Sequence, residues 1–144
     1  MKFVSQNYDE TLKIAKEFAV RLKPGDIIAL HGDIGVGKTV FVRGVMSCFG
    51  DETQVTSPTF SVMNIYDGTV PLYHFDLYRM EDEEEIYACG LDEYIEGNGI
   101  SLIEWPDILS LKKNYDVTIQ KNLDINEDYR EIIISGDGYE DSCS

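Results

Sequence analysis

The chain has 144 residues and a formal net charge of −15 at pH 7, from 27 acidic and 12 basic residues. A surface this acidic repels polyanions at physiological salt, which argues against unaided nucleic-acid binding. No apolar run approaches the roughly 18 residues needed to cross a bilayer and no signal-like N-terminus is present, so we expect a cytoplasmic protein with no membrane contact. We expect one domain over residues 1–135 and a polar, frayed tail over residues 136–144.

The first predicted element is a helix that runs to about Lys23. Asn7 and Glu10 have the spacing of a capping box, and an apolar face follows at helical spacing. Pro24–Gly25 ends the helix, and residues 26–31 then form a short apolar run. We predict a buried strand over this run, leading directly into a glycine-rich loop.

Residues 32–39, GDIGVGKT, fit the phosphate-loop pattern G-x-x-x-x-G-K-[ST] at every position. Glycines let the backbone turn its N–H groups towards an anion, Lys38 would reach the β- and γ-phosphates, and Thr39 would offer its hydroxyl to Mg²⁺. A hairpin turn is the alternative, but apolar residues follow at helical rather than strand spacing up to Gly50. The predicted nucleotide-binding residues are Gly32, Asp33, Gly35, Val36, Gly37, Lys38, Thr39 and Val40.

The rest of the chain supplies further strands. A hairpin is predicted around Asp67–Gly68, and its second strand carries Leu72, His74 and Asp76 on one face. An acidic helical region over residues 81–94 leads to a buried strand over residues 100–103, and residues 117–119 and 131–134 form a terminal hairpin. Together these elements predict an α/β, three-layer P-loop NTPase fold with a central, mostly parallel sheet and antiparallel edge strands.

Two acids follow convincing apolar strands, Asp76 and Glu104. Ligands of such folds bind at the carboxyl ends of the strands, so these carboxylates are the candidates for holding Mg²⁺ and for orienting the attacking water. Their spacing does not divide the two roles, and each could instead cap a helix. With Lys38 they form the predicted catalytic set, with ATP/ADP and Mg²⁺ as cofactors. The three cysteines form no C-x-x-C pair, which argues against zinc.

Several motifs, in this order and spacing, resemble the TsaE family: GDIGVGKT at 32–39, SPTF at 57–60, HFDLYR at 74–79, GLDEY at 90–94 and EWP at 104–106. The similarity spans about residues 1–135. It implies a small bacterial ATPase that works with the TsaD and TsaB proteins in threonylcarbamoyladenosine synthesis. Such proteins modify the adenosine beside the anticodon of tRNAs that read codons beginning with A, and tRNA is contacted only indirectly.

The resemblance also assigns roles. Thr39 and Glu104 are associated with magnesium, and Asp76 acts in the metal and hydrolysis site. Thr59 belongs to a nucleotide-sensing loop with its Ser-Pro neighbours, and Trp105 packs beside the site. Val40 stands where many members have a second hydroxyl residue, which puts a secondary phosphate contact in doubt.

Three other functions are alternatives to the ATPase. A small-molecule kinase needs a lid with several arginines, but Arg43 lies inside a helix and Arg130 far along the chain. A GTPase needs an N-K-x-D base-reading motif, which is absent. A nucleotide-gated binding module with little turnover overlaps the family prediction. Comparing single-turnover with steady-state hydrolysis would separate those two.

Overall fold

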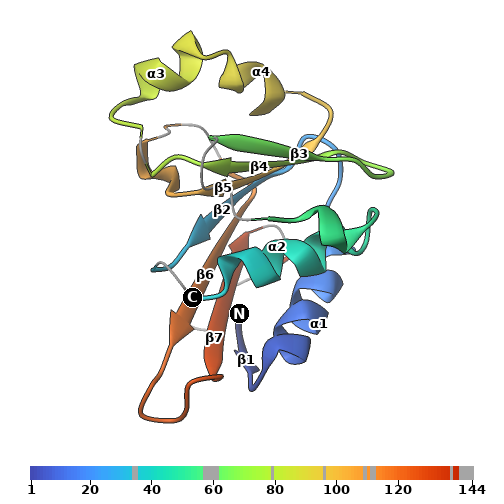
Figure 1. The fold of residues 1–144 in the computed structure, drawn as a ribbon, viewed down its shortest axis with the longest axis vertical. Coiled ribbons are helices and arrows are strands. Elements are labelled where there is room, and N and C mark those ends of the chain that lie inside the picture. The colour runs from blue at the N-terminus through green and yellow to red at the C-terminus, as the bar shows by residue number, and fades with distance from the viewer. Residues whose placement is uncertain are drawn as a thin grey trace.

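A seven-stranded sheet forms the centre of the computed structural model (Figure 1). The structure describes residues 1–33, 36–56, 62–78, 80–95, 97–108, 110, 113–136 and 138–139. The strand order is β1-β7-β6-β2-β5-β4-β3. The strands are β1 (Lys2–Ser5), β2 (Ile27–His31), β3 (Met63–Tyr66), β4 (Leu72–Asp76), β5 (Ile100–Glu104), β6 (Tyr115–Lys121) and β7 (Arg130–Gly136).

The middle of the sheet is parallel and its edges are antiparallel. β2 pairs in parallel with both β5 and β6, and β4 pairs in parallel with β5. The β3–β4 hairpin forms one edge, and β7 with β1 forms the other. This is the predicted fold class, and β5, which lies between two parallel neighbours, has all five of its residues buried. β1 was not predicted.

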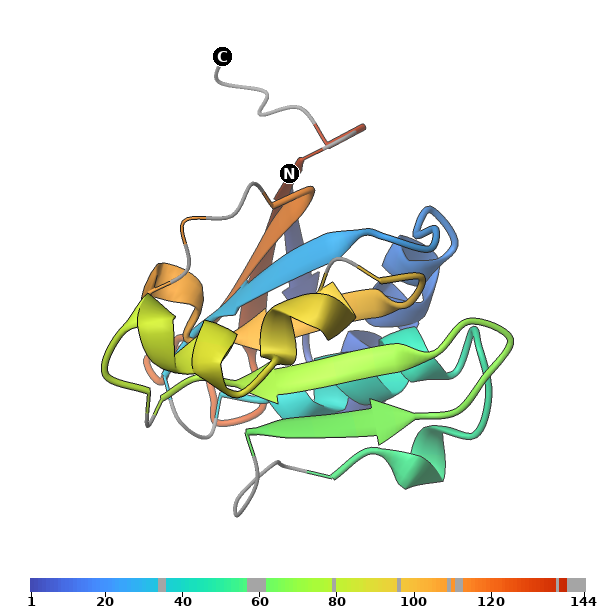
Figure 2. The ribbon, with the colours of Figure 1, turned by 90° about the horizontal axis from the view of Figure 1, so that it is seen from above.

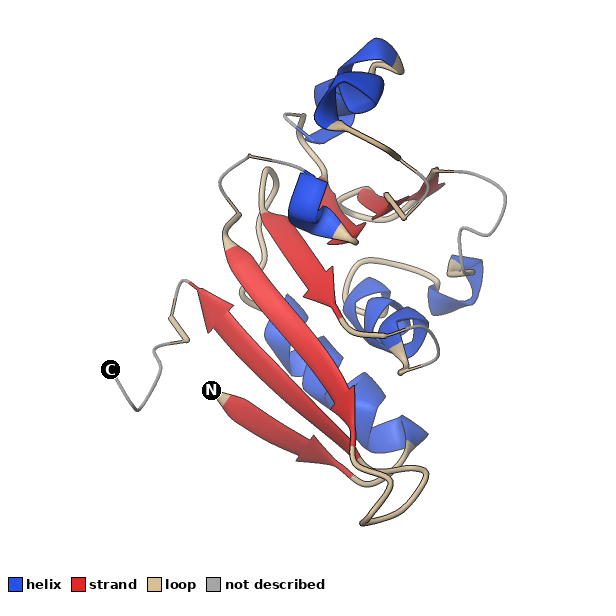
Figure 3. Ribbon diagram, turned by 90° about the vertical axis from the view of Figure 1, so that its left-hand side faces the viewer, coloured by secondary structure: helices blue, strands red, loops and turns tan. Residues whose placement is uncertain are grey.

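Helices cover both faces of the sheet (Figures 2 and 3). α1 (Tyr8–Ala19) and α2 (Lys38–Met46) pack with β2, β5 and β7 in the larger core. α3 (Glu83–Ala88) and α4 (Leu91–Ile95) pack with Phe75 and Ile103 in a second core. The short 3-10 helices are η1 (Glu52–Gln54) and η2 (Pro106–Ile108). The sheet therefore lies between two helical layers, as predicted.

Side chains along β4 and β5 point alternately to the two faces of the sheet, and those on one face point towards α2. Leu72 and Leu102 belong to the core of α1 and α2, whereas Phe75 and Ile103 belong to the core of α3 and α4. Because side chains two residues apart in a strand share a face, the alternation places Glu104 on the α2 side with Leu102. His74 and Asp76 share that side with Leu72, as predicted.

The end of the first helix differs from expectation. α1 ends at Ala19 rather than near Lys23. Half of the predicted capping box is present, since the side chain of the N-cap residue Asn7 accepts from the Glu10 N–H at 2.9 Å. The Glu10 carboxylate accepts at 3.0 Å from the N–H of Gln6, one residue before the N-cap, rather than from that of Asn7. No helix of the described residues is long and apolar enough to cross a membrane.

The end of the chain departs from the prediction of a frayed tail from residue 136. Gly136 belongs to β7, and Tyr139 bridges back to it. The Tyr139 ring is buried against Phe18 and Tyr115, which stabilises this part of the chain by burying apolar surface. Residues 137 and 140–144 lie outside the described residues.

Candidate nucleotide-binding site

The loop after β2 has the backbone shape that its glycines allow. Gly32 has a φ of 147°, and a Cβ there would lie 2.7 Å from the Ile119 carbonyl oxygen and 2.8 Å from the Val36 side chain. Gly37 has a φ of 103°. Both positions therefore require glycine, the first because of space and conformation and the second because of conformation.

The N-terminus of α2 has no side-chain cap. Gly37 is the N-cap and provides no side-chain hydrogen bond, and no acidic residue lies in the first turn. Lys38, Thr39 and Val40 are the first three helical residues, so their N–H groups have no acceptor within the helix. Uncapped N–H groups and the helix dipole both favour an anion at this point.

Lys38 lies at the centre of the candidate site. Its side chain is only 6% exposed, and Nζ donates to the Gly32 carbonyl oxygen at 2.8 Å. The same ammonium lies 3.4 Å from a carboxylate oxygen of Glu104 and 4.5 Å from the centroid of the Trp105 ring. The structure thus brings the predicted lysine of the phosphate loop and the predicted acid at the end of β5 into direct contact, and it confirms that Trp105 packs beside them.

Trp105 has an unusual backbone. Among the described residues it is the one non-glycine position with a positive φ, at 58°. A bulky residue in this conformation stores strain of roughly 1–3 kcal/mol, which is typical of sites where a side chain must be aimed. Its ring also packs on Tyr78, with centroids 5.0 Å apart.

Asp76 lies beside Glu104 but makes different contacts. The two residues are register partners on the parallel strands β4 and β5. Asp76 Oδ1 accepts a hydrogen bond from the Tyr78 N–H at 3.1 Å, so this carboxylate caps the turn that follows β4. Asp76 thus stabilises a turn and does not cap a helix, since the N-cap of the next helix, α3, is Asp82; it lies at the same edge of the sheet as Glu104.

A histidine that was predicted only as a strand residue contacts the site. His74 is fully buried, and its Nε2 lies 2.5 Å from Glu104 Oε2. Its Nδ1 lies 3.0 Å from the hydroxyl of Tyr66, a residue of β3. The signal that could have identified His74 was its position two residues before Asp76, on the same face of a strand that ends at the site.

Glu104 is ionised in spite of its burial. Burial alone raises its pKa, but the hydrogen bond and charge of His74 and the charge of Lys38 outweigh this effect, so the pKa of Glu104 lies below its usual value. The carboxylate is therefore available as an anion across the physiological pH range.

Arg130 is the second residue whose position the sequence did not reveal. It was set aside as too distant in the chain, but β7 brings its Nε to 2.8 Å from the Val36 carbonyl oxygen in the phosphate loop. Its terminal nitrogen also donates to the carbonyl oxygens of Glu127 and Tyr129. The guanidinium thus ties the loop to the β6–β7 turn. No local pattern predicts this contact, because it joins residues 94 positions apart.

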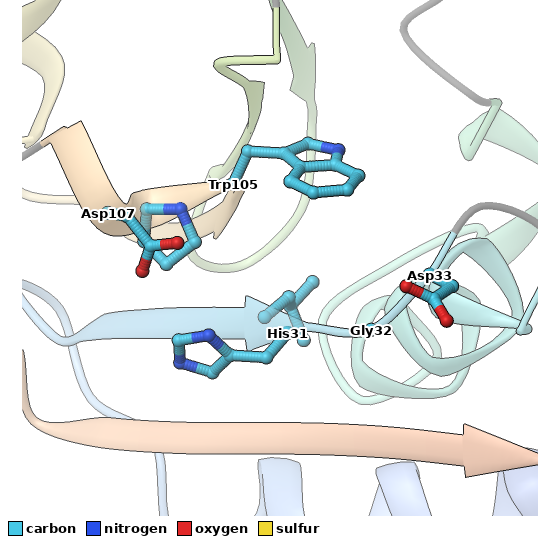
Figure 4. A pocket seen from close by; sticks show the side chains of 7 residues that line it. His31, Gly32, Asp33, Trp105 and Asp107 are labelled. Atoms are coloured by element: carbon cyan, nitrogen blue, oxygen red, sulfur yellow. The ribbon is translucent and has the colours of Figure 1, made fainter.

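A pocket of about 180 Å³ opens beside this arrangement (Figure 4). It lies between the end of β2 and the start of η2, at the carboxyl ends of the parallel strands, where ligands of such folds bind. His31, Asp33, Trp105 and Asp107 are among its lining residues. Asp33, a predicted nucleotide contact, is exposed at its edge.

The oxygen donors present suit Mg²⁺ bound together with a nucleotide. Mg²⁺ is usually held by one or two protein oxygens and by phosphates, rather than by a cage of protein ligands. Among the described residues, no group of three or more His, Cys, Asp or Glu side chains could hold a metal without further ligands. Thr39 in the first turn of α2 and the carboxylates of Glu104 and Asp76 provide donors of the required type. Gly35 and Thr59, both predicted to contact nucleotide, lie outside the described residues.

Strand, glycine loop and helix on a mostly parallel sheet define a protein of the P-loop NTPase fold. A family model described as "Threonylcarbamoyl adenosine biosynthesis protein TsaE" matches residues 5–132. The chain therefore belongs to the TsaE family.

Individual relatives agree with this assignment. The chain is 41% identical to a Bacillus subtilis protein named "tRNA threonylcarbamoyladenosine biosynthesis protein TsaE", over 99% of this chain and 91% of that protein. A Treponema pallidum protein of the same name is 32% identical, over 94% of this chain and the whole of that protein. The crystal structure of B. subtilis YdiB is similar with a TM-score of 0.71 and 37% identity, covering 92% of this chain and 82% of that one.

Proposed function

We propose that this protein binds and hydrolyses ATP, and that it does so as a component of tRNA threonylcarbamoyladenosine synthesis. The observation that carries the proposal is the buried contact between Lys38 of the phosphate loop and Glu104 at the end of β5. A lysine and a carboxylate at the carboxyl edge of a parallel sheet are what phosphoryl transfer requires, because that reaction depends mainly on positioning and charge stabilisation. The pathway is proposed from the names of the relatives.

The proposed roles follow from the contacts. The ammonium of Lys38 would exchange the Gly32 carbonyl for the β- and γ-phosphates, and the N–H groups of the first turn of α2 would bind the same phosphates. Thr39 with Glu104, Asp76 or both would hold Mg²⁺, which neutralises charge on the phosphates when bound. If only one of the two acids holds the metal, the other would orient the attacking water. Gly32, Gly37 and Val36 give the loop its shape.

The partners are proposed to be TsaD and TsaB, with tRNA contacted only through them and with the cytoplasm as the location. Both the charge of the chain and its membership of the TsaE family support these partners. Acidic residues exceed basic residues by 15, and the lysine of the phosphate loop would be occupied by nucleotide. An acidic face can dock on a basic protein surface and gives an association rate that falls with salt.

Steady-state ATP hydrolysis, measured with and without TsaD and TsaB, tests the proposal. Lys38→Ala removes the one lysine placed at the phosphates and should lower the rate by at least 100-fold. Lys13→Ala is the matched control, since Lys13 is an exposed lysine on α1. A folded Lys38→Ala protein that hydrolyses ATP at the parent's rate would overturn the site. A parent that binds ATP but turns it over only once would instead favour the nucleotide-gated binding module.

A further inference from the structure

Three buried polar side chains form a row across β3, β4 and β5, on the face of the sheet that α2 covers. They are Tyr66, His74 and Glu104, which are 3%, 0% and 6% exposed. The Tyr66 hydroxyl lies 3.0 Å from His74 Nδ1, and His74 Nε2 lies 2.5 Å from Glu104 Oε2. Burying polar groups is costly unless each one is hydrogen-bonded, and here each has a partner.

The row begins at a backbone group. The Tyr66 hydroxyl donates to the carbonyl oxygen of Thr56 at 2.9 Å. Burial raises the pKa of the Tyr66 phenol, so the hydroxyl keeps the proton that it donates. Both ring nitrogens of His74 are then engaged, one by Tyr66 and one by Glu104, which fixes the orientation of the imidazole.

The fixed imidazole sets the orientation of the Glu104 carboxylate. His74 binds Oε2, and this leaves Oε1 as the oxygen that faces Lys38 at 3.4 Å. Without His74 the carboxylate would lose the partner of one oxygen and could rotate about its terminal torsion, which is broad for glutamate. A partner behind an acid at a reaction centre commonly affects activity by about 10- to 100-fold, although it contacts no substrate.

We propose that His74 and Tyr66 are positioning residues for the reaction: Tyr66, anchored on the Thr56 carbonyl, orients His74, and His74 holds Glu104 so that one carboxylate oxygen faces Lys38 and the phosphates. This proposal rests on the proposed ATPase function. It assigns the pair no contact with nucleotide. Their effect on hydrolysis is therefore transmitted through Glu104 alone.

The test uses variants of similar size. His74→Leu removes both hydrogen bonds and should lower kcat for ATP hydrolysis by about 10- to 100-fold, with the Kd for ADP changed less than about threefold. His74→Gln keeps an N–H donor that can reach Glu104 and should recover part of the loss. Tyr66→Phe should give a smaller loss than His74→Leu. Tyr73→Phe is its matched control, because Tyr73 lies on the opposite face of β4 against Tyr94.

A double-mutant cycle separates positioning from general damage. If His74 acts only through Glu104, His74→Leu combined with Glu104→Gln should be no slower than Glu104→Gln alone. The proposal would be overturned if the loss of kcat in the double variant equalled the product of the two single losses. It would also be overturned by a folded His74→Leu protein with the parent's kcat. A parent without ATPase activity would overturn the proposed function instead.

A second readout does not depend on hydrolysis. The chain has two histidines, so imidazole N–H resonances of ¹⁵N-histidine-labelled protein are readily assigned with a His31→Gln variant. We expect two protected N–H signals for His74, one of them shifted by Glu104→Gln and the other by Tyr66→Phe. Signals that neither substitution moves would contradict the hydrogen-bonded row.

Discussion

At the scale of single residues, the site is built from charges that compensate one another in a buried place. Lys38, Glu104 and His74 would each be costly to bury alone, and removing one partner of a buried pair typically costs about 3–5 kcal/mol. In this structure the Lys38 ammonium contacts the Glu104 carboxylate and donates to the Gly32 carbonyl oxygen. If a phosphate took the place of the Gly32 carbonyl, Glu104 would still be a partner of the lysine.

The two acids are expected to separate by their dependence on magnesium. Asp76→Asn and Glu104→Gln should each slow hydrolysis, and only the metal ligand should also weaken the affinity for ADP when magnesium is present. Titrating magnesium at fixed ADP, followed by the emission of Trp105, the only tryptophan in the chain, measures this difference. Full turnover in both variants would show that the two carboxylates are structural.

At the scale of elements, the phosphate loop is supported from both sides. β2 and α2 continue the loop in sequence, and Arg130 of β7 binds the Val36 carbonyl from across the sheet. A hydrogen bond from a charged donor contributes about 1.5–3 kcal/mol. Arg130 therefore fixes the Val36 carbonyl, and the Val36 N–H donates to the Asp33 carbonyl oxygen at 3.3 Å, so both backbone groups of Val36 are held in place.

Arg130→Met should weaken binding of both ATP and ADP by roughly tenfold, because the loop loses a charged hydrogen bond that fixes its shape. Equilibrium titration with each nucleotide measures the change. Arg21→Met is the control, since Arg21 lies where α1 leads into β2, at the opposite ends of the strands, against Tyr139. If Arg130→Met binds both nucleotides with the parent's affinity, the arginine does not support the loop.

Much of this element framework could be predicted because its signals are local. The glycine spacing, the helical periodicity after Lys38 and the two acids after apolar strands are each visible within a few residues. The contacts of Arg130 and Tyr66 could not be predicted, because they depend on which strands become neighbours. β1 was not predicted because it has only four residues, of which one is buried, and so short a strand gives little hydrophobic pattern. The position of Tyr139 was not predicted because a single aromatic residue in a polar tail carries no periodic signal.

At the scale of the whole molecule, charge is the dominant feature. With 27 acidic and 12 basic residues and a net charge of −15, the chain carries few lysines and arginines to displace counterions from nucleic-acid phosphates. The acidic first turns of α3 and α4 gather carboxylates on the layer that covers β4 and β5. Such a face favours a basic protein partner over tRNA.

The isolated protein should therefore not bind tRNA with useful affinity. Anisotropy titration at about 0.15 M salt, where screening resembles that of the cell, should give a Kd above the micromolar range, and adding the partner proteins should strengthen the binding. Submicromolar binding of tRNA by the isolated chain would show that the acidic surface does not prevent direct binding.

If nucleotide hydrolysis at Lys38 serves tRNA modification, the amount of threonylcarbamoyladenosine in cellular tRNA should depend on Lys38. The host is a bacterium depleted of its own TsaE family protein, and the nucleoside is quantified by mass spectrometry. The parent chain and Lys13→Ala should restore the modified nucleoside, whereas Lys38→Ala at equal abundance should not. Full restoration by a folded Lys38→Ala protein would contradict this dependence.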